Sequence, residues 1–193
     1  MKDKKKDREQ NKKSVWARQK KREVIVWAVR IAAVLLLSFA GVMLFGRTVS
    51  IQENSMDPTI LAGDDVLINK AVYLLGSPDR GDVIVYKSSD SQDAAYHVKR
   101  VVGLPGEHIQ IKDGLILING VTYMENLELP NISDPGIAGE GVKLGSDEYF
   151  VLGDNRNGSE DSRFADVGNI PGSAIKGRIW FIHAPKDRRG MVK

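Results

Sequence analysis

The sequence predicts a mostly β domain preceded by one membrane-spanning helix. Three observations lead to this fold class. A single long apolar stretch, residues 24–45, follows a strongly basic N-terminal segment. From residue 64 onward, short apolar runs alternate with turn signals, a pattern typical of β-strands. With 193 residues and 42% hydrophobic content, the chain has room for one compact domain beside such a helix.

The N-terminal segment differs in charge from the rest of the chain. Residues 2–23 contain eleven Lys or Arg and four acidic residues, whereas the whole chain carries a net charge of only +3. Such a basic run alone is also compatible with nucleic acid or acidic lipid. Next to an apolar span, Lys and Arg mark the side that stays in the cytoplasm. We therefore expect residues 1–23 to form a basic cytoplasmic tail.

The apolar stretch from residue 24 to 45 is long enough for one membrane crossing. As a helix it would extend about 33 Å, against a hydrocarbon core of about 30 Å. Its one ionised residue, Arg30, lies near the N-terminal end, where the side chain can reach the headgroups. A buried helix and a removable signal peptide are the alternatives, but no suitable small-residue cleavage site stands out. We interpret residues 24–45 as an uncleaved single-pass signal anchor in the cell membrane.

Residue types exclude some kinds of chemistry. The chain has no cysteine, so it has neither disulfides nor a thiol that could act as nucleophile or metal ligand. His97, His108 and His183 are scattered without the spacing of a zinc site. We expect neither a metal nor another cofactor.

The remaining chain, residues 46–193, is predicted to be one extracytoplasmic β-rich domain. The dipeptides Asp113-Gly114 and Asn119-Gly120 tolerate the positive φ of tight hairpin turns. Residues 125–147 are rich in Gly, Pro, Asn and acidic residues, which predicts a long connection or a small flap. The predicted strands are residues 64–69, 82–87, 97–102, 108–112, 115–119, 149–152 and 175–183.

Ser55 and Lys99 are the residues that point to a reaction. A serine hydroxyl is a poor nucleophile until a base removes its proton, and a lysine can be that base if burial lowers its pKa. Lys99 lies in a predicted apolar strand and shares one face with His97 and Val101. Lysine is rarely buried without a reason. The pair therefore suggests a Ser/Lys hydrolase at a membrane surface.

Four sequence blocks surround these two residues. In combination with the anchor, they resemble bacterial type I signal peptidases over essentially the whole chain after residue 20. The resemblance implies a signal-peptidase-like β-fold and a membrane-bound serine endopeptidase that removes signal peptides from exported preproteins after Ala-x-Ala-like sequences. No large insertion separates the third and fourth blocks, as in the compact Gram-positive form. The blocks are SMDPT (55–59) with Gly63-Asp64 after it, RGDVIVY (80–86), KRVVGLPG (99–106) and GDNRNGSEDSR (153–163).

The resemblance also implies roles for individual residues. By motif position, Ser55 would be the nucleophile and Lys99 the general base. Ser159 matches a serine whose hydroxyl orients the lysine. Asp161 and Arg163 match residues that hold the last block in place, as a salt bridge beside the site.

The resemblance also indicates which residues line the substrate pockets and which groups stabilise the oxyanion of the reaction. Ile51, Ile60 and Val98 match positions that line the S1 and S3 pockets for small side chains. The backbone N–H of Ser55 is the natural first oxyanion donor. In the family a second donor often lies two residues before the nucleophile, where this chain has Glu53. A backbone N–H and the Asn54 amide remain open as the second donor, and Glu53 is a candidate for modifying which preproteins are accepted.

Three other functions share some of these sequence features. A Ser/His signal peptidase of the archaeal kind would need histidine where Lys99 stands, and His97 lies two residues earlier. The SOS-type repressor autoproteases share the Ser/Lys pair but need a DNA-binding module. A dedicated peptidase or a non-proteolytic assembly factor for a surface structure such as a pilus is the remaining alternative. As partners we expect signal peptides, the lipid bilayer and a nearby secretion translocon, with no nucleic acid, and we expect a monomer.

Overall fold

The structure is a computed structural model that describes residues 2–45, 47–74, 76–88 and 95–192. Within these ranges, the structure does not describe the side chains of residues 2–15, 17, 18, 40, 42–45 and 47. The chain divides into two compact units, residues 1–43 and 44–193.

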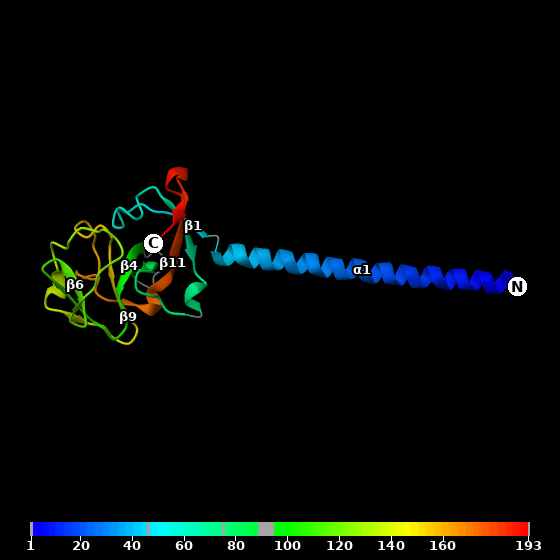
Figure 1. Cartoon of the computed structure of the whole chain (residues 1–193), viewed down its shortest axis with the longest axis horizontal. Coiled ribbons are helices and arrows are strands. Elements are labelled where there is room, and N and C mark those ends of the chain that lie inside the picture. The colour runs from blue at the N-terminus through cyan, green and yellow to red at the C-terminus, as the bar shows by residue number, and fades with distance from the viewer. Residues whose placement is uncertain (1, 46, 75, 89–94, 193) are drawn as a thin grey trace. The chain divides into compact units, whose positions relative to one another are not determined.

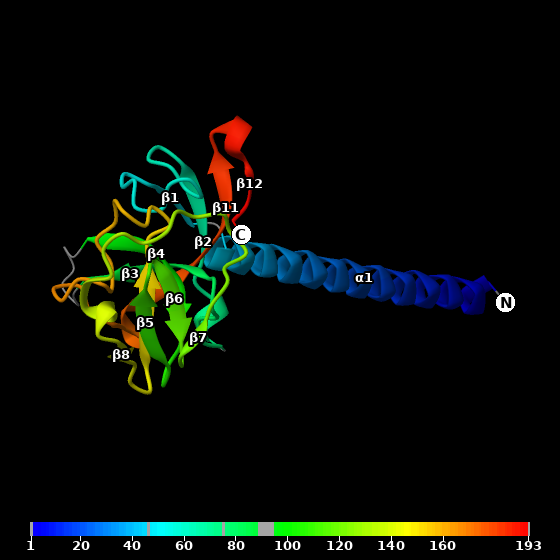
Figure 2. The same ribbon diagram turned by 60° about the vertical axis from the view of Figure 1, so that its left-hand side comes forward.

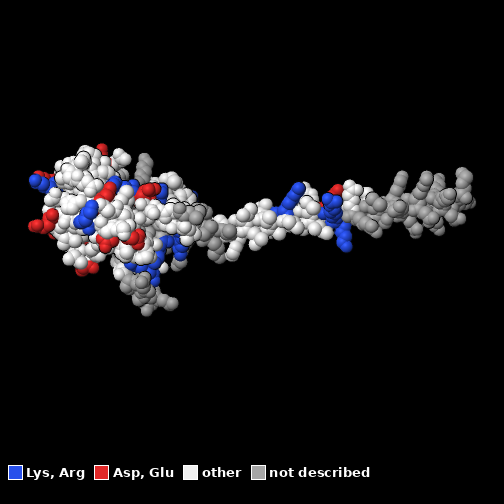
Figure 3. All heavy atoms as spheres, turned by 90° about the horizontal axis from the view of Figure 1, so that it is seen from below, with Lys and Arg blue, Asp and Glu red and all other residues white. Residues whose placement is uncertain are grey.

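The first unit is helical. Helix α1 runs from Lys2 to Phe45 without interruption. Residues 31–39 carry no charged side chain and are exposed, and they belong to the uncharged stretch of the helix in Figure 3. Among the residues described, no helix combines the length and hydropathy needed to cross a bilayer. Part of the predicted anchor, Ala40 and residues 42–45, lies outside the described side chains.

The second unit is mostly β, as predicted, and its strands form two antiparallel sheets in the described part of the chain (Figures 1 and 2). The larger sheet has the order β1-β2-β11-β3-β4-β9-β10, with β12 paired to β11. Its strands are β1 (Arg47–Ser50), β2 (Asp65–Asn69), β3 (Val83–Lys87), β4 (Tyr96–Gly103), β9 (Glu148–Leu152), β10 (Ile170–Pro171), β11 (Ile175–Ala184) and β12 (Gly190–Met191). Short 3₁₀ helices are η1 (Val72–Leu74), η2 (Gly136–Gly139), η3 (Gly172–Ala174) and η4 (Lys186–Arg188).

The smaller sheet has the order β7-β6-β5-β8 and is labelled at the front of Figure 2. Both of its hairpins turn at the predicted dipeptides. Asp113 and Gly114 have φ values of 51° and 77°, and Asn119 and Gly120 have values of 52° and 81°. Positive φ at two successive residues matches the twist of the flanking strands. Its strands are β5 (His108–Lys112), β6 (Leu115–Ile118), β7 (Val121–Thr122) and β8 (Val142–Lys143).

All seven predicted strands are present, with ends that differ from the prediction by at most one residue. The strands that the sequence did not indicate are β1, β7, β8, β10 and β12, which have two to four residues each. Such lengths are too short for an alternating pattern to appear. The predicted connection, residues 125–147, contains only η2 and β8 as regular elements.

The strands at the centre of the large sheet are covered on both faces. In β3, Val83 and Val85 belong to one core cluster, whereas Ile84 and Tyr86 belong to another. Successive side chains of a strand point to opposite faces, so two apolar layers enclose β3. This is why the strand is apolar at successive positions. Lys99 of β4 pairs with Ile84. Its side chain therefore leaves the strand on the same face of the sheet as Ile84, which is covered by the second cluster.

A buried ion pair connects three segments of the chain close to Ser55 and Lys99. The guanidinium of Arg100 donates to both carboxylate oxygens of Asp154, at 2.8 and 2.7 Å, and also to the carbonyl oxygen of Gly81 at 2.7 Å. The hydroxyl of Thr59 donates to the same carboxylate. Strand β4, the turn after Ser55 and the loop after β9 are thereby joined.

Replacing Asp154 by Ala should strongly destabilise this unit, because it leaves the buried Arg100 charge without its partner. We expect the free energy of unfolding to fall by about 3–5 kcal/mol. Urea denaturation of the purified chain, followed by circular dichroism, measures the loss. Glu140→Gln, at an exposed position, is the control. A loss below about 1 kcal/mol for Asp154→Ala would contradict this account.

Candidate active site

Ser55 lies in a closed loop between β1 and β2. Backbone bonds from Ile51 N–H to Asp64 O (2.9 Å) and from Gly63 N–H to Ile51 O (2.8 Å) close the base of this loop. Met56, next to the serine, is fully buried in the core. The carbonyl oxygen of Ser55 accepts a hydrogen bond from the Asn155 N–H at 3.1 Å. The serine is therefore held from both sides by backbone contacts.

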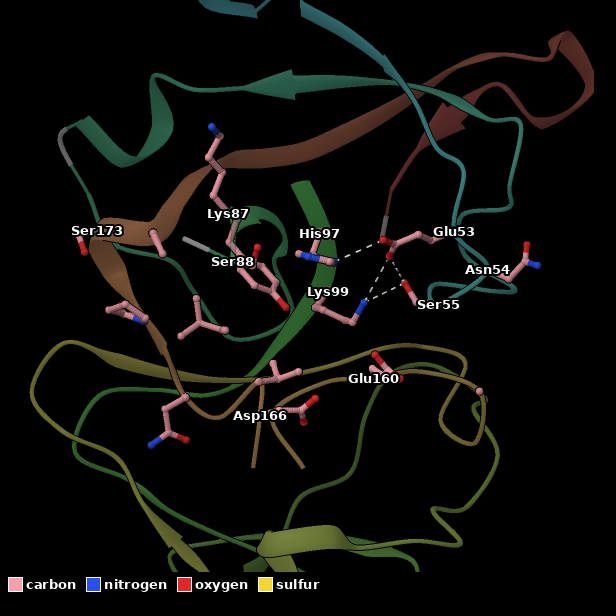
Figure 4. A pocket seen from close by; sticks show the side chains of 17 residues that line it. Glu53, Asn54, Ser55, Lys87, Ser88, His97, Lys99, Glu160, Asp166 and Ser173 are labelled. Atoms are coloured by element: carbon pink, nitrogen blue, oxygen red, sulfur yellow. Dashed lines mark hydrogen bonds and ion pairs between the residues drawn. The ribbon is translucent and has the colours of Figure 1, made fainter. Parts of the chain in front are cut away.

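Lys99 of β4 brings its amine to this serine. Its Nζ lies 3.0 Å from Ser55 Oγ, well within hydrogen-bond distance (Figure 4). The exposed fractions are only 2% for Lys99 and 8% for Ser55. Two residues that are 44 positions apart in the chain thus meet in a site largely closed to water.

Burial changes the chemistry of the amine. Loss of water lowers the pKa of Lys99 below its usual value. The carboxylates of Glu53, Asp161 and Glu160 oppose this effect, and burial has the larger influence on that pKa. A neutral amine with a free lone pair can accept a proton from a hydroxyl within hydrogen-bond distance. The geometry and the direction of the pKa shift fit a general base.

Ser159 is buried, and its hydroxyl bonds to the backbone of its own loop. Its hydroxyl donates to the carbonyl oxygen of Glu160 at 3.5 Å. Within the described residues, no hydrogen bond joins Ser159 to Lys99. The role in orienting the lysine therefore remains a prediction from the resemblance.

Asp161 and Arg163 form a buried ion pair, with Arg163 Nε 2.8 Å from Asp161 Oδ1. The other carboxylate oxygen of Asp161 accepts a hydrogen bond from the Gly153 N–H at 3.0 Å. Arg163 also donates to the carbonyl oxygens of Asp134 and Ser159. These contacts fix the loop 153–163 at its two ends.

An apolar cavity of about 340 Å³ opens beside the serine. Ile51 and Val98, two of the three predicted pocket residues, line it together with Met56 and Val85. Ile60, the third, is fully buried in the same core cluster and is not among the described residues that line the cavity. The cavity has the size and lining to accept small apolar side chains.

A second cavity of about 630 Å³ is more polar and contains the amine of Lys99. His97, Glu160, Asp166 and Ser173 are among its lining residues (Figure 4). Ser55 and Glu53 line both cavities. The serine therefore lies where the two cavities meet.

Glu53 has contacts that sequence analysis did not foresee. One carboxylate oxygen lies 3.4 Å from Ser55 Oγ and 3.7 Å from Lys99 Nζ, and the other lies 3.4 Å from His97 Nδ1. The available signal was its position two residues before Ser55, where the resemblance leads one to expect a small residue. The side chain of Asn54 points away from Lys99 in Figure 4, which argues against its amide as an oxyanion donor.

Metal binding has no support in the described part of the chain. No group of three or more His, Asp or Glu side chains there has an arrangement that could hold a metal ion. The chemistry available at this site is that of a serine hydroxyl, a buried amine and nearby carboxylates.

Comparison with known proteins agrees with this chemistry. Residues 24–184 match the family described as signal peptidase, peptidase S26. The chain is 33% identical over 178 residues to signal peptidase I P of Bacillus subtilis subsp. natto, which covers 89% of this chain and 95% of that protein. It is 30% identical to signal peptidase IB of Staphylococcus aureus, covering 83% and 90%. A probable signal peptidase I-2 of Synechocystis is 35% identical, covering 74% and 65%.

A serine beside a buried amine, in a chain with these relatives, defines the class of protein: it is a serine endopeptidase. The chain belongs to the signal peptidase family, peptidase S26.

Gly153 lies where the loop 153–163 packs closely against Ser55. A Cβ at this position would clash with the Ser159 hydroxyl and with the carbonyl oxygen of Ser55. We expect Gly153→Ala to displace Ser55 and to reduce kcat/KM for peptide cleavage by about 100-fold, because catalysis tolerates little misplacement. Gly190→Ala, where no such clash arises, is the control. Similar activity of both variants would show that this approach does not position the serine.

Proposed function

We propose that this protein is a membrane-bound signal peptidase I that cleaves N-terminal signal peptides from exported preproteins after Ala-x-Ala-like sites. Ser55 is the nucleophile and Lys99 the general base. The observation that carries the proposal is the 3.0 Å contact between the buried Lys99 amine and the Ser55 hydroxyl. The family membership of the chain supports the substrate class.

The proposed reaction begins with proton transfer. Neutral Lys99 takes the hydroxyl proton of Ser55 as the serine oxygen bonds to the scissile carbonyl carbon. The resulting ammonium then gives its proton to the leaving amine as the carbon–nitrogen bond breaks, which leaves an acyl-enzyme. Water, deprotonated by Lys99, attacks the ester carbonyl; the bond to Ser55 Oγ then breaks, Lys99 returns the proton to that oxygen, and the signal peptide leaves with a free carboxyl end.

His97 is a weaker candidate for the base. Its Nδ1 faces Glu53 rather than the serine, and no hydrogen bond between His97 and Ser55 occurs among the described residues. This geometry favours the Ser/Lys reaction over the Ser/His alternative.

For the oxyanion, we propose the backbone N–H of Ser55 as the first donor. Among the described residues this N–H donates no hydrogen bond, so it is available to a substrate oxygen. An oxyanion is best stabilised by donors already fixed in place.

Substrate selection follows from the apolar cavity in this proposal. An extended peptide projects alternate side chains to the same side, so residues one and three before the cleaved bond reach the same wall. Ile51 and Val98 give that wall an apolar surface suited to small side chains such as Ala.

The proposed location is the cell membrane. The mainly apolar segment of 22 residues, 24–45, supports a single anchor, and the net positive charge of residues 2–23 supports an N-terminus in the cytoplasm. The domain from residue 46 would then act on the outer side, as a monomer near the secretion translocon and the lipid surface. Such an arrangement brings the serine to membrane-held substrates.

The decisive experiment compares wild type, Ser55→Ala and Lys99→Met with a purified preprotein that has an Ala-x-Ala site. Wild type should cleave after the second alanine, as mass spectrometry of the new N-terminus reports. Both variants should lose at least 10³-fold in rate, because a nucleophile and its base act as a unit.

Two outcomes would overturn the proposal. Appreciable cleavage by Lys99→Met would remove Lys99 as the base. An intact preprotein after incubation with folded wild type would favour a dedicated peptidase or an assembly factor for a surface structure.

The pH dependence of cleavage should follow the protonation of Lys99. Only the neutral amine accepts a proton, so kcat/KM should rise with pH as Lys99 loses its proton. Burial lowers the pKa of Lys99, so this rise should be centred below the usual range of a lysine side chain. A flat profile from mildly acidic to alkaline pH would contradict a lysine base.

A further inference from the structure

Glu53 touches both members of the proposed Ser/Lys pair and a third group outside it. Its Oε2 lies 3.4 Å from Ser55 Oγ and 3.7 Å from Lys99 Nζ, while its Oε1 lies 3.4 Å from His97 Nδ1 (Figure 4). The Glu53 side chain is 45% exposed, whereas that of Lys99 is 3% exposed. A partly exposed carboxylate thus reaches into the most buried part of the site.

The contact with Lys99 works against the proposed base. An anion within 4 Å favours the protonated amine, and the charge of Glu53 raises the pKa of Lys99 against the effect of burial. A protonated Lys99 cannot remove the hydroxyl proton of Ser55. In the geometry described, Glu53 therefore decreases the fraction of enzyme that is ready to react.

The contact with Ser55 also opposes the reaction, because it places a negative charge next to the attacking oxygen. Attack on a peptide carbonyl creates a negative oxygen within bonding distance of the carbon that Ser55 attacks. A carboxylate 3.4 Å from the attacking oxygen repels that developing charge. Glu53 must leave this position for attack to be fast. His97, already 3.4 Å from the other carboxylate oxygen, is a group that can hold it.

We propose that Glu53 is a positioning residue that restrains the Ser/Lys pair: in the free enzyme its carboxylate lies against Lys99 and Ser55 and disfavours proton transfer between them, and entry of substrate moves this carboxylate away from Ser55 to His97. This inference rests on the proposed roles of Ser55 and Lys99. It concerns a residue where this chain departs from the small residue that the resemblance leads one to expect.

Other ionisable groups face the same site and enter the interpretation of any pH profile. Asp161 and Glu160, from the loop 153–163, also favour the protonated amine. Tyr86 of β3 lines the polar cavity, and its pKa is raised by burial and then by the charges of Glu53 and Asp161. Among the described residues, the other ionisable side chains that line this cavity are Lys87, His97 and Asp166.

The first test is the pH dependence of kcat/KM for preprotein cleavage by Glu53→Gln and Glu53→Ser. Both variants remove the charge next to Lys99, so the rising limb should move to lower pH by about one unit. At mildly acidic pH the variants should be faster than wild type. Glu160→Gln removes a charge from the same cavity without a contact to Ser55, and its limb should move less.

The second test examines His97 as the alternative holder of the carboxylate. His97→Gln should lower kcat/KM by about threefold or more in the wild-type background. The same substitution should have less than half that effect in the Glu53→Gln background, because no carboxylate remains to be held. Equal effects in both backgrounds would remove His97 from the proposal.

An unshifted limb, or a shift to higher pH, in the folded Glu53→Gln and Glu53→Ser variants would overturn the inference. Lower activity of both variants at every pH would do the same, since a restraint cannot be needed for turnover. If Lys99→Met is inactive and the limb does not move, only the role of Glu53 fails. If Lys99→Met is active, the proposed base itself fails.

Discussion

The buried contact between Lys99 and Ser55 places opposing demands on the rest of the domain. The amine must lose its water to be neutral, so it needs a covered face of a sheet, which β3 and β4 supply between two apolar layers. It must also stay open to a peptide, so the serine lies at the junction of two cavities. Carboxylates on the neighbouring segments oppose the first demand. The chemistry of the site depends on the balance between desolvation and nearby charge.

Buried ion pairs are the means by which separate segments are held around this contact. Arg100 with Asp154, and Arg163 with Asp161, are nearly inaccessible to solvent and have additional hydrogen bonds to backbone carbonyl groups. Such pairs contribute little net stability, but they fix geometry because a misplaced partner leaves a bare charge. The loop 153–163 has no regular secondary structure, so its shape depends on these contacts.

The sequence was informative where a pattern extends over several residues. Strands such as β3 and β11 were predicted within one residue because their length and apolar content are distinctive. Strands of two residues, such as β10, depend on tertiary pairing and left no local pattern. Ser55 and Lys99 were found through their motifs, and the structure brings them together. The three contacts of Glu53 could not be predicted, because they depend on side-chain directions in a loop and a strand that are distant in sequence.

The carbonyl oxygen of Ser55 is bonded to the backbone of Asn155, and the amine arrives from β4, so the site is assembled from three widely separated stretches of chain. During synthesis the serine emerges about one hundred residues before the segment that completes its surroundings. Until then Lys99 is hydrated and carries its proton at neutral pH. Under the proposed mechanism, a partly folded chain lacks the neutral amine that would activate Ser55. The proposed reaction therefore becomes possible only when folding has brought these three stretches of chain together.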